Sequence, residues 1–199
     1  ESAYVVDAGP FHIASIVECL GTKVLVADRM AELTGGTFYD AIAQDTIAMA
    51  VNDLVTVGAT PLVVQAYWAA GGSSWFDDRV RSQALVEGWR RACERCGASW
   101  GGGETPALAG VVAEGRVDLA AACTGIVRPK SRLTLGADLA PGDAIVLLAS
   151  SGIHANGLSL ARALADRLPH GYRTPIDARG TTFGEALLVP TVLYPPVTE

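Results

Sequence analysis

The sequence predicts a mixed α/β or α+β fold, because segments with helical and with strand-like periodicity alternate along the chain. Of the 199 residues, 50% are apolar and 18% are charged, a composition that allows a sizeable core and is not typical of a disordered chain. The 22 glycines are scattered among apolar runs and therefore indicate tight turns and close backbone approaches. Because the spacings between segments are irregular, the pattern alone does not distinguish α/β from α+β.

The first expected elements are two strands joined by a turn at residues 9–10, with the second strand over residues 11–17. We interpret the polar, glycine-containing residues 28–38 as a loop. In residues 39–58 the apolar positions fall on one arc of a 3.6-residue wheel, which predicts a helix whose apolar face meets the core.

The same alternation continues in the rest of the chain. Asp77 and Asp78 are expected to cap a long helix that ends near residue 97. The other expected elements are strands over residues 62–69, 117–127 and 144–149, a helix over residues 156–168, and a sharp loop at the glycine run 101–103.

Charge and hydropathy exclude several classes of partner. The chain has 15 Lys and Arg against 21 Asp and Glu, a net charge of −6, so we expect neither a nucleic-acid partner nor a membrane surface. No uninterrupted apolar stretch approaches the ~18 residues of a membrane span, and the first residues contain no export signal. The four cysteines are few and scattered, which is typical of a reducing compartment, so a cytoplasmic protein is expected.

Oxygen-bearing side chains on the helix of residues 39–58 form the first candidate site. Asp45 and Asn52 are two turns apart and about 20° out of register, so both can point into one cleft, and Asp53 is adjacent. Oxygen donors on one face suit Mg²⁺, which takes carboxylates, phosphate oxygens and water. The alternative is an exposed Asp45 with Asn52 or Asp53 capping a loop, and spacing alone favours that alternative.

Residues 101–105 form the second candidate. Gly102 and Gly103 would let the backbone approach a phosphate, while Glu104 would supply a metal ligand and Thr105 a hydroxyl. The alternative is an ordinary turn that enters a strand.

Residues 150–157 form the third candidate, because they follow an apolar strand and precede a helix. In this arrangement the free N–H groups at a helix N-terminus can bind an anion. Ser151, His154 and Asn156 supply further polar groups, and His154 could hydrogen-bond or donate a proton to a phosphate. The alternative, that Ser and Asn only cap the helix, has equal weight.

Thr22 and Lys23, with Glu18 before them, form the fourth candidate. Lys23 can pair with a phosphate as a point charge, although the spacing of a Walker loop is absent and a surface lysine is the alternative. Cys93 and Cys96 are i, i+3 neighbours on a helix, so we interpret them as core residues and not as metal ligands.

Four motifs in register resemble the phosphoribosylformylglycinamidine cyclo-ligase (aminoimidazole ribonucleotide synthetase) family, and the resemblance covers residues 16–194. They are residues 44–54 with 58–62, residues 102–105 (Gly-Gly-Glu-Thr), residues 149–162 (with Ser-Ser-Gly-Ile-His-Ala-Asn-Gly) and residues 187–194 (with Leu-Leu-Val-Pro-Thr).

The resemblance implies a mixed α/β N-terminal domain over residues 1–140 whose sheet dimerises into a β-barrel. Residues 141–199 would begin a second α+β domain that is truncated. The implied activity is the ATP-dependent ring closure of formylglycinamidine ribonucleotide to aminoimidazole ribonucleotide in purine biosynthesis, with ADP and phosphate released. The implied protein is therefore a homodimeric ligase that uses ATP and Mg²⁺ on a small phosphorylated substrate.

The resemblance also implies roles for individual residues. Those expected to hold Mg²⁺ against the ATP phosphates are Asp45, Glu104, Asn52 and Glu18. Those expected to contact the nucleotide are Thr22, Lys23, Asp45, Gly102, Gly103, Glu104 and Thr105. Those expected to be catalytic, by binding the substrate phosphate or the reacting amide, are Ser151, His154 and Asn156. On this view Asp45→Asn weakens Mg²⁺-ATP binding far more than folding.

Three departures from the family pattern leave alternatives open. The family has Asp and Gly where this chain has Glu18 and Cys19, and it has an acid where this chain has Ala107. One alternative is another ATP-using member of the superfamily, such as a hydrogenase maturation dehydratase, a thiamine-phosphate kinase or a selenide kinase. The other is a non-catalytic nucleotide-binding subunit.

Overall fold

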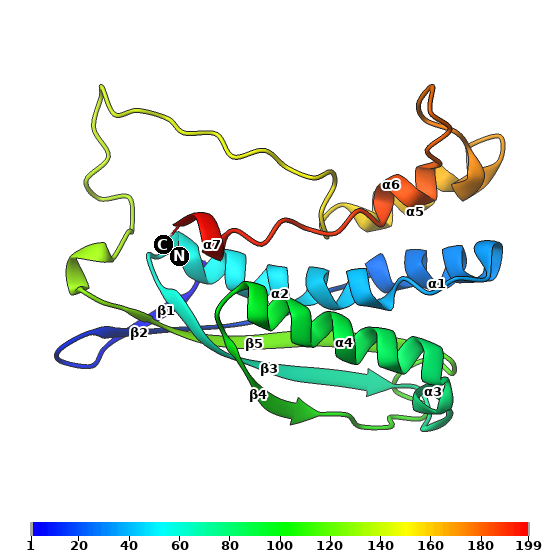
Figure 1. Cartoon of the computed structure of the whole chain (residues 1–199), viewed down its shortest axis with the longest axis horizontal. Coiled ribbons are helices and arrows are strands. Elements are labelled where there is room, and N and C mark those ends of the chain that lie inside the picture. The colour runs from blue at the N-terminus through cyan, green and yellow to red at the C-terminus, as the bar shows by residue number, and fades with distance from the viewer. Residues whose placement is uncertain (1, 199) are drawn as a thin grey trace.

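The computed structural model describes residues 2–198, in which five strands form one mixed sheet with helices on one face (Figure 1). The strand order is β1-β2-β5-β3-β4, and only the β3–β4 pair is parallel. The strands are β1 (Tyr4–Asp7), β2 (His12–Cys19), β3 (Thr60–Ala70), β4 (Ser99–Glu104) and β5 (Val117–Val127). The alternating pattern leaves α/β and α+β open, and the structure confirms the mixed α+β class.

Helices α2 (Tyr39–Thr56) and α4 (Arg79–Arg95) pack over the inner face of the sheet, and α1 (Lys23–Thr34) lies beside α2 (Figure 1). The remaining helical segments are short: α3 (Ser74–Asp77), η1 (Lys130–Arg132), α5 (Leu158–Ala165), η2 (Gly171–Arg173), α6 (Phe183–Leu187) and α7 (Pro195–Thr198). None of the helices within residues 2–198 combines the length and the apolar character that crossing a bilayer requires.

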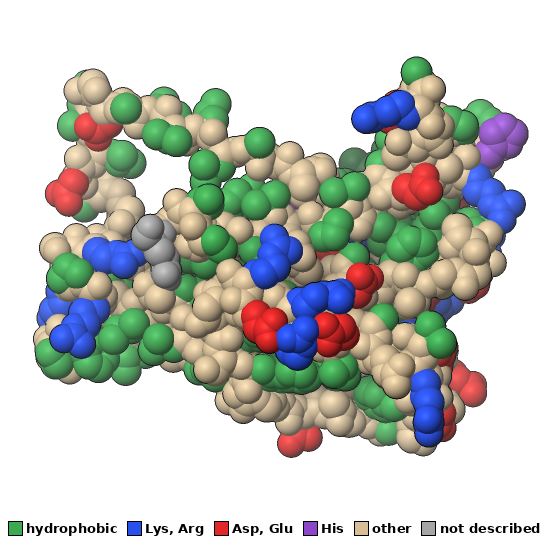
Figure 2. Space-filling model, in the orientation of Figure 1, with side chains coloured by type: hydrophobic (Ala, Val, Ile, Leu, Met, Phe, Trp, Pro, Cys, Tyr) green, Lys and Arg blue, Asp and Glu red, His purple; other side chains and the backbone are tan. Residues whose placement is uncertain are grey.

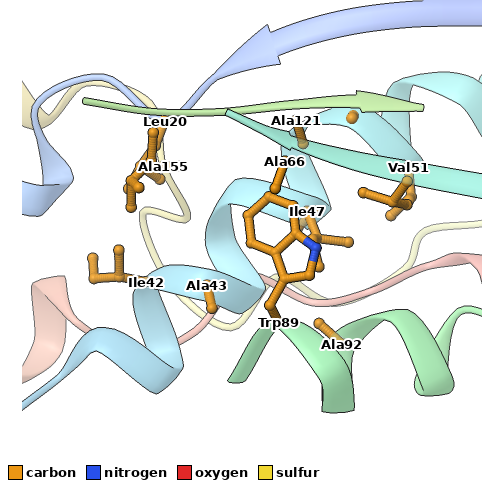
Figure 3. Packing of buried hydrophobic residues seen from close by; sticks show 14 of the residues in the cluster. Leu20, Ile42, Ala43, Ile47, Val51, Ala66, Trp89, Ala92, Ala121 and Ala155 are labelled. Carbon is orange, nitrogen blue, oxygen red and sulfur yellow. The ribbon is translucent and has the colours of Figure 1, made fainter. Parts of the chain in front are cut away.

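The core lies between the sheet and helices α2 and α4. Ile47 and Val51 of α2 are fully buried, as the helical wheel predicts, and alternate residues of β5 are buried because strand side chains point to opposite faces. Figure 3 shows the indole of Trp89 reaching from α4 toward Ile47 and Ala66. Trp89 also meets Trp68 edge-on, with ring centroids 5.3 Å apart. The apolar side of α2 is thereby anchored, which leaves its other side to form the site below.

Several sequence predictions are confirmed by the element bounds. The helix expected over residues 39–58 is α2, and the strands expected at residues 62–69 and 117–127 are β3 and β5. Asp78 caps α4 by accepting a hydrogen bond from the Arg81 N–H (3.1 Å).

The loop predicted over residues 28–38 is confirmed for residues 35–38 and wrong for residues 28–34, because α1 continues to Thr34. Val26, Ala27 and Met30 form a buried stripe at helical spacing, while Arg29 and other polar residues occupy the exposed side. When the buried apolar stripe of a helix is narrow, most of the helix sequence is polar, and such a sequence resembles that of a loop.

The sharp loop predicted at residues 101–103 is also wrong, because these glycines belong to β4. A Cβ on Gly103 would lie 2.0 Å from the Ala66 carbonyl oxygen, and a Cβ on Gly101 would lie 2.4 Å from the Val63 side chain. The missing side chains therefore allow β4 to approach β3.

Residues 144–149 do not form the predicted strand. Ile145, Val146 and Leu147 are 87%, 80% and 89% exposed, and the segment stands away from the rest of the molecule (Figures 1 and 2). Within residues 2–198 no strand pairs with it, and an apolar strand is stable only when its backbone groups find partners. The helix predicted over residues 156–168 is shorter, since α5 begins after Gly157, whose φ is +70°.

Replacing Gly88 by alanine will lower the free energy of unfolding by about 1–3 kcal/mol, because it overpacks the contact between α2 and α4. A Cβ at Gly88 would lie 2.5 Å from the Asp40 carbonyl oxygen. The matched control is Gly72→Ala, whose Cβ would meet only the Ser74 hydroxyl, at 3.7 Å, and which should change stability by less than about 0.5 kcal/mol. Urea denaturation measures both, and equal stability of the two variants would contradict the packing account.

Candidate functional site

Two adjoining cavities lie between the end of β2, one side of α2 and the loop of residues 154–157. Their volumes are about 340 and 180 Å³. Both are lined by Met49 and Asn156, so they form one depression, which we call the α2 groove. Leu20 and Ala155 line the larger cavity and lie together in Figure 3, where they pack the loop against the end of β2.

Residues from three separate motifs meet in the α2 groove. The sequence-predicted residues that line it are Glu18, Thr22, Asn52, His154 and Asn156. Asp53 of α2 also lines it. The sequence shows Asp53 as an oxygen donor next to Asn52, but the family resemblance does not place it among the expected metal ligands.

Among residues 2–198, the charged side chains that line the α2 groove at neutral pH are carboxylates, and no Lys or Arg lines either cavity. Burial, and then the negative charge of Asp53, raises the pKa of Glu18 above its ordinary value. Burial alone raises the pKa of Asp53. The negative charge of Asp53 therefore acts on the Glu18 carboxylate, and a bound cation would offset the negative charge of both side chains.

The ring of His154 is held at one nitrogen. The Ser151 N–H donates to His154 Nε2 (3.3 Å), and the Ser150 hydroxyl lies 3.1 Å from the same nitrogen. Because a backbone N–H can only donate, Nε2 is the acceptor, and the neutral imidazole carries its proton on Nδ1. No hydrogen bond found in residues 2–198 uses Nδ1, so this N–H is free to bind a ligand.

Lys23 and Asp45 form an ion pair beneath the α2 groove. Lys23 Nζ lies 2.8 Å from Asp45 Oδ2, and both side chains are 0% exposed. Burial lowers the pKa of Lys23 and raises that of Asp45, while each partner's charge opposes the shift. In this structure neither side chain reaches a cavity where a nucleotide or a metal would bind.

The segment of residues 189–194 runs along α2 (Figure 1) and is fastened by side chains of that helix. Gln44 Nε2 donates to the Thr191 carbonyl (2.7 Å). The Asn52 amide donates to the Val192 carbonyl (2.8 Å) and accepts from the Tyr194 N–H (2.9 Å). The amide of Asn52 is therefore committed to the backbone, although the residue lines the groove.

Other predicted residues lie elsewhere. The Ser151 hydroxyl donates to the Pro190 carbonyl (2.7 Å) and so secures the segment of residues 189–194. Glu104 of β4 pairs with Tyr67 of β3. On its other side β3 pairs with β5, and β5 pairs with β2, where Cys19 lies level with Tyr67. Three strand spacings, about 14 Å, therefore separate Glu104 from Cys19 at the groove. Gly102, Gly103 and Thr105 accompany Glu104 and do not line the groove.

No group of three or more His, Cys, Asp or Glu side chains in residues 2–198 is arranged to hold a metal by itself. Mg²⁺ is often bound by one or two carboxylates and completes its shell with substrate phosphates and water. Glu18 and Asp53 therefore fit an ion that is shared with a bound phosphate, and not one enclosed by protein ligands alone.

A further cavity, of about 560 Å³, lies at the far end of α1, and the residues of the four sequence motifs do not line it. Its buried carboxylate, Asp28, accepts from the Tyr39 hydroxyl (2.7 Å) and from Arg116 Nη1 (2.6 Å). The Arg81 guanidinium lies over the Trp75 ring, 4.5 Å from its centroid. Asp28 and Arg116 therefore pair with each other, whereas the sequence motifs meet in the α2 groove, so the groove is the better candidate site.

Comparison with known families decides the identity of the fold. The family model described as "AIR synthase related protein, N-terminal domain" matches residues 1–127. The chain belongs to the AIR synthase related protein family. The family resemblance carried by the four motifs is confirmed.

Curated relatives of this AIR synthase related chain carry one name. "Phosphoribosylformylglycinamidine cyclo-ligase" of Sorangium cellulosum is 38% identical over 183 residues, which cover 92% of this chain and 49% of the relative. The protein of the same name from an Anaeromyxobacter species is 39% identical over 188 residues, covering 92% and 50%. The chain thus spans about half the length of the curated relatives it matches.

A solved structure supports the AIR synthase related fold. It is described as "AaThiL complexed with AMPPCP and TMP" and aligns with a TM-score of 0.50 at 16% identity, over 63% of this chain and 36% of that chain. At this identity the likeness shows the fold alone.

Proposed function

We propose that this chain serves an ATP-dependent cyclo-ligase of purine biosynthesis, which converts formylglycinamidine ribonucleotide to aminoimidazole ribonucleotide and releases ADP and phosphate. The names of relatives at 38% and 39% identity support the reaction. The convergence of Glu18, Asp53, His154 and Asn156 in the α2 groove supports its location.

The observation that carries the proposal is the charge of the α2 groove. Glu18 and Asp53 line it and no Lys or Arg does, so a bare triphosphate would be repelled. Glu18 and Asp53 would hold Mg²⁺, which when bound neutralises phosphate charge. Of the four metal ligands that the resemblance implies, Glu18 keeps this role in the proposal, and Asp53 joins it.

Other groups of the chain would position the anionic ligand. Leu158 and Ser159, in the first turn of α5, line the larger cavity. N–H groups in the first turn of a helix have no partner within the helix, so they are available to phosphate oxygens. The Nδ1–H of His154 and the amide of Asn156 would donate to the substrate phosphate or to the reacting amide.

We also propose that two copies of the chain associate through the outer face of the sheet, as the family resemblance implies. Within residues 2–198 no helix covers this face (Figure 1), whereas α4 on the opposite side carries the ion pairs that gather in the middle of Figure 2. The exposed apolar side chains on the outer face of the sheet include Tyr4, Val6, Ile13, Val17 and Tyr67, of which Tyr4 and Val17 are more than 70% exposed. A face of this kind is stable in water when a second apolar sheet covers it.

Substituting Val17 by aspartate will convert the dimer to a monomer at the same concentration, because it places a charge in the apolar sheet face. Val17 is 71% exposed on β2. The matched control is Val80→Asp, since Val80 is 68% exposed on α4, on the other side of the sheet. Sedimentation velocity measures both, and a dimer that persists in the first variant or dissociates in the second would contradict the proposed interface.

We propose further that residues 141–199 begin a second α+β unit and that the protein acts in the cytoplasm. The exposed apolar segment of residues 144–149 supports the first point, because such a segment gains stability when a strand pairs with it.

Release of ADP and phosphate from MgATP with formylglycinamidine ribonucleotide, measured on the full protein, tests the reaction. Turnover that depends on this substrate supports the cyclo-ligase. Turnover only with a different acceptor would indicate another branch of the superfamily. Tight MgATP binding without any turnover would replace the enzyme by a non-catalytic nucleotide-binding subunit.

A further inference from the structure

The ammonium group of Lys23 is enclosed by oxygen atoms of the protein. Nζ of Lys23 donates hydrogen bonds to the carbonyl oxygens of His154 (2.8 Å) and Val189 (3.1 Å), and it forms an ion pair with Asp45 Oδ2 at 2.8 Å. The side chain is 0% exposed, so a nucleotide phosphate could reach it only if these contacts opened.

The carboxylate of Asp45 completes this buried arrangement. Its Oδ1 accepts from both the N–H (2.8 Å) and the hydroxyl of Thr191. The pair therefore joins α1 and α2 to two distant parts of the chain, the loop at His154 and the segment of residues 189–194.

The loop that Lys23 holds has an uncommon backbone conformation. His154 has φ of +58° and is the only residue other than glycine with positive φ in residues 2–198. This left-handed region is sparsely populated for side-chain-bearing residues and persists when surrounding contacts determine it. The hydrogen bond from Lys23 ends on the carbonyl of this same residue.

We propose that Lys23 is a positioning residue: its buried ammonium group, balanced by Asp45, fixes the backbone of His154 in the left-handed conformation and so sets the direction of the imidazole in the α2 groove. The part played by the imidazole in turnover rests on the proposed function. The structural part does not, because it concerns the loop of the ligand-free chain.

The double variant Lys23→Met with Asp45→Asn tests the proposal. It removes both buried charges at nearly constant volume, and the amide oxygen at position 45 can still accept from Thr191, so the fold should survive. The chain has three histidines, so histidine-selective ¹³C and ¹⁵N labelling gives three sets of NMR signals, with His12 and His170 as internal references. The one-bond Cα–Hα coupling distinguishes positive from negative φ.

In the double variant we expect the His154 coupling to move to the range of negative φ while the reference histidines stay unchanged. We also expect the Ser151 N–H, which donates to His154 Nε2, to exchange with solvent about tenfold faster. The matched control is Thr191→Val, which removes one contact to Asp45 but leaves Lys23 on the His154 carbonyl. Its His154 coupling should equal that of the wild type.

An unchanged His154 coupling in the folded double variant would overturn the proposal, as would an equal change in Thr191→Val. If the protein turns over, the double variant should lower kcat with KM for MgATP unchanged. A rise in KM alone would instead assign Lys23 to the nucleotide. Absence of turnover in the wild type would refute the proposed function and would leave the NMR result to decide the role of Lys23.

Discussion

Replacing Asp45 by alanine will lower the free energy of unfolding by about 3–5 kcal/mol, because the ammonium group of Lys23 is then buried without its counter-charge. The two side chains are 0% exposed and their charged atoms are 2.8 Å apart. Thr191 also loses the acceptor of its N–H and hydroxyl. Urea denaturation of the two proteins at one pH measures the difference.

The matched control for this prediction is Asp40→Ala, the same change on the same helix. Asp40 is half exposed and pairs with Arg91 at 3.3 Å, so its loss should cost about 0–1 kcal/mol. Equal costs for the two substitutions would show that the buried pair adds nothing. The buried ion pair gives Asp45 a structural role in the fold, so Asp45→Asn should also cost stability; its expected effect on Mg²⁺-ATP binding stays a prediction.

Replacing Glu18 by glutamine and Asp53 by asparagine together will abolish Mg²⁺-dependent nucleotide binding. Each change keeps the size of the side chain and removes its charge. The loss should exceed the about 10- to 100-fold that removal of a metal's outer-shell partner causes, because the proposed ligands themselves are changed. Calorimetric titration with the non-hydrolysable MgATP analogue AMPPCP measures the affinity.

The matched control for the groove is Glu114→Gln. Glu114 is an exposed carboxylate that lines the cavity of about 560 Å³ at the far end of α1. Its substitution should leave the affinity unchanged. If Glu114→Gln weakened binding and the groove variant did not, the nucleotide site would lie in this cavity at the far end of α1 and not in the α2 groove.

Much of the fold could be predicted because its signals are local. The apolar stripe of α2 and the alternation of β5 repeat within a few residues, and each is decided by packing against the same sheet. The errors arose where packing partners were remote. The glycine run of β4 resembles a turn in sequence, and only its close contact with β3 shows that it is a strand. Residues 144–149 have the apolar sequence of a strand, but within residues 2–198 no strand pairs with them.

The candidate site could be predicted in part. His154 and Asn156 lie between an apolar run and a helix, and Glu18 precedes a glycine turn, so the local sequence alone identifies these polar residues as candidates. The burial of Lys23 is not visible, because its acceptors at residues 154 and 189 are more than 130 positions away. Sequence patterns show which residues are polar, whereas long-range contacts decide which of them remain free.

On the proposed function, Glu18 and Asp53 bind a divalent cation together with a nucleotide in the α2 groove. Titration of histidine-labelled protein with Mn²⁺ and AMPPCP tests this binding mode, because the paramagnetic ion broadens the signals of nearby nuclei. His154 lines the groove, whereas His12 lies at the start of β2, about 20 Å along the strand from Glu18. We predict that the His154 signals disappear while those of His12 persist. Equal broadening of both, or none at saturating ligand, would contradict the account.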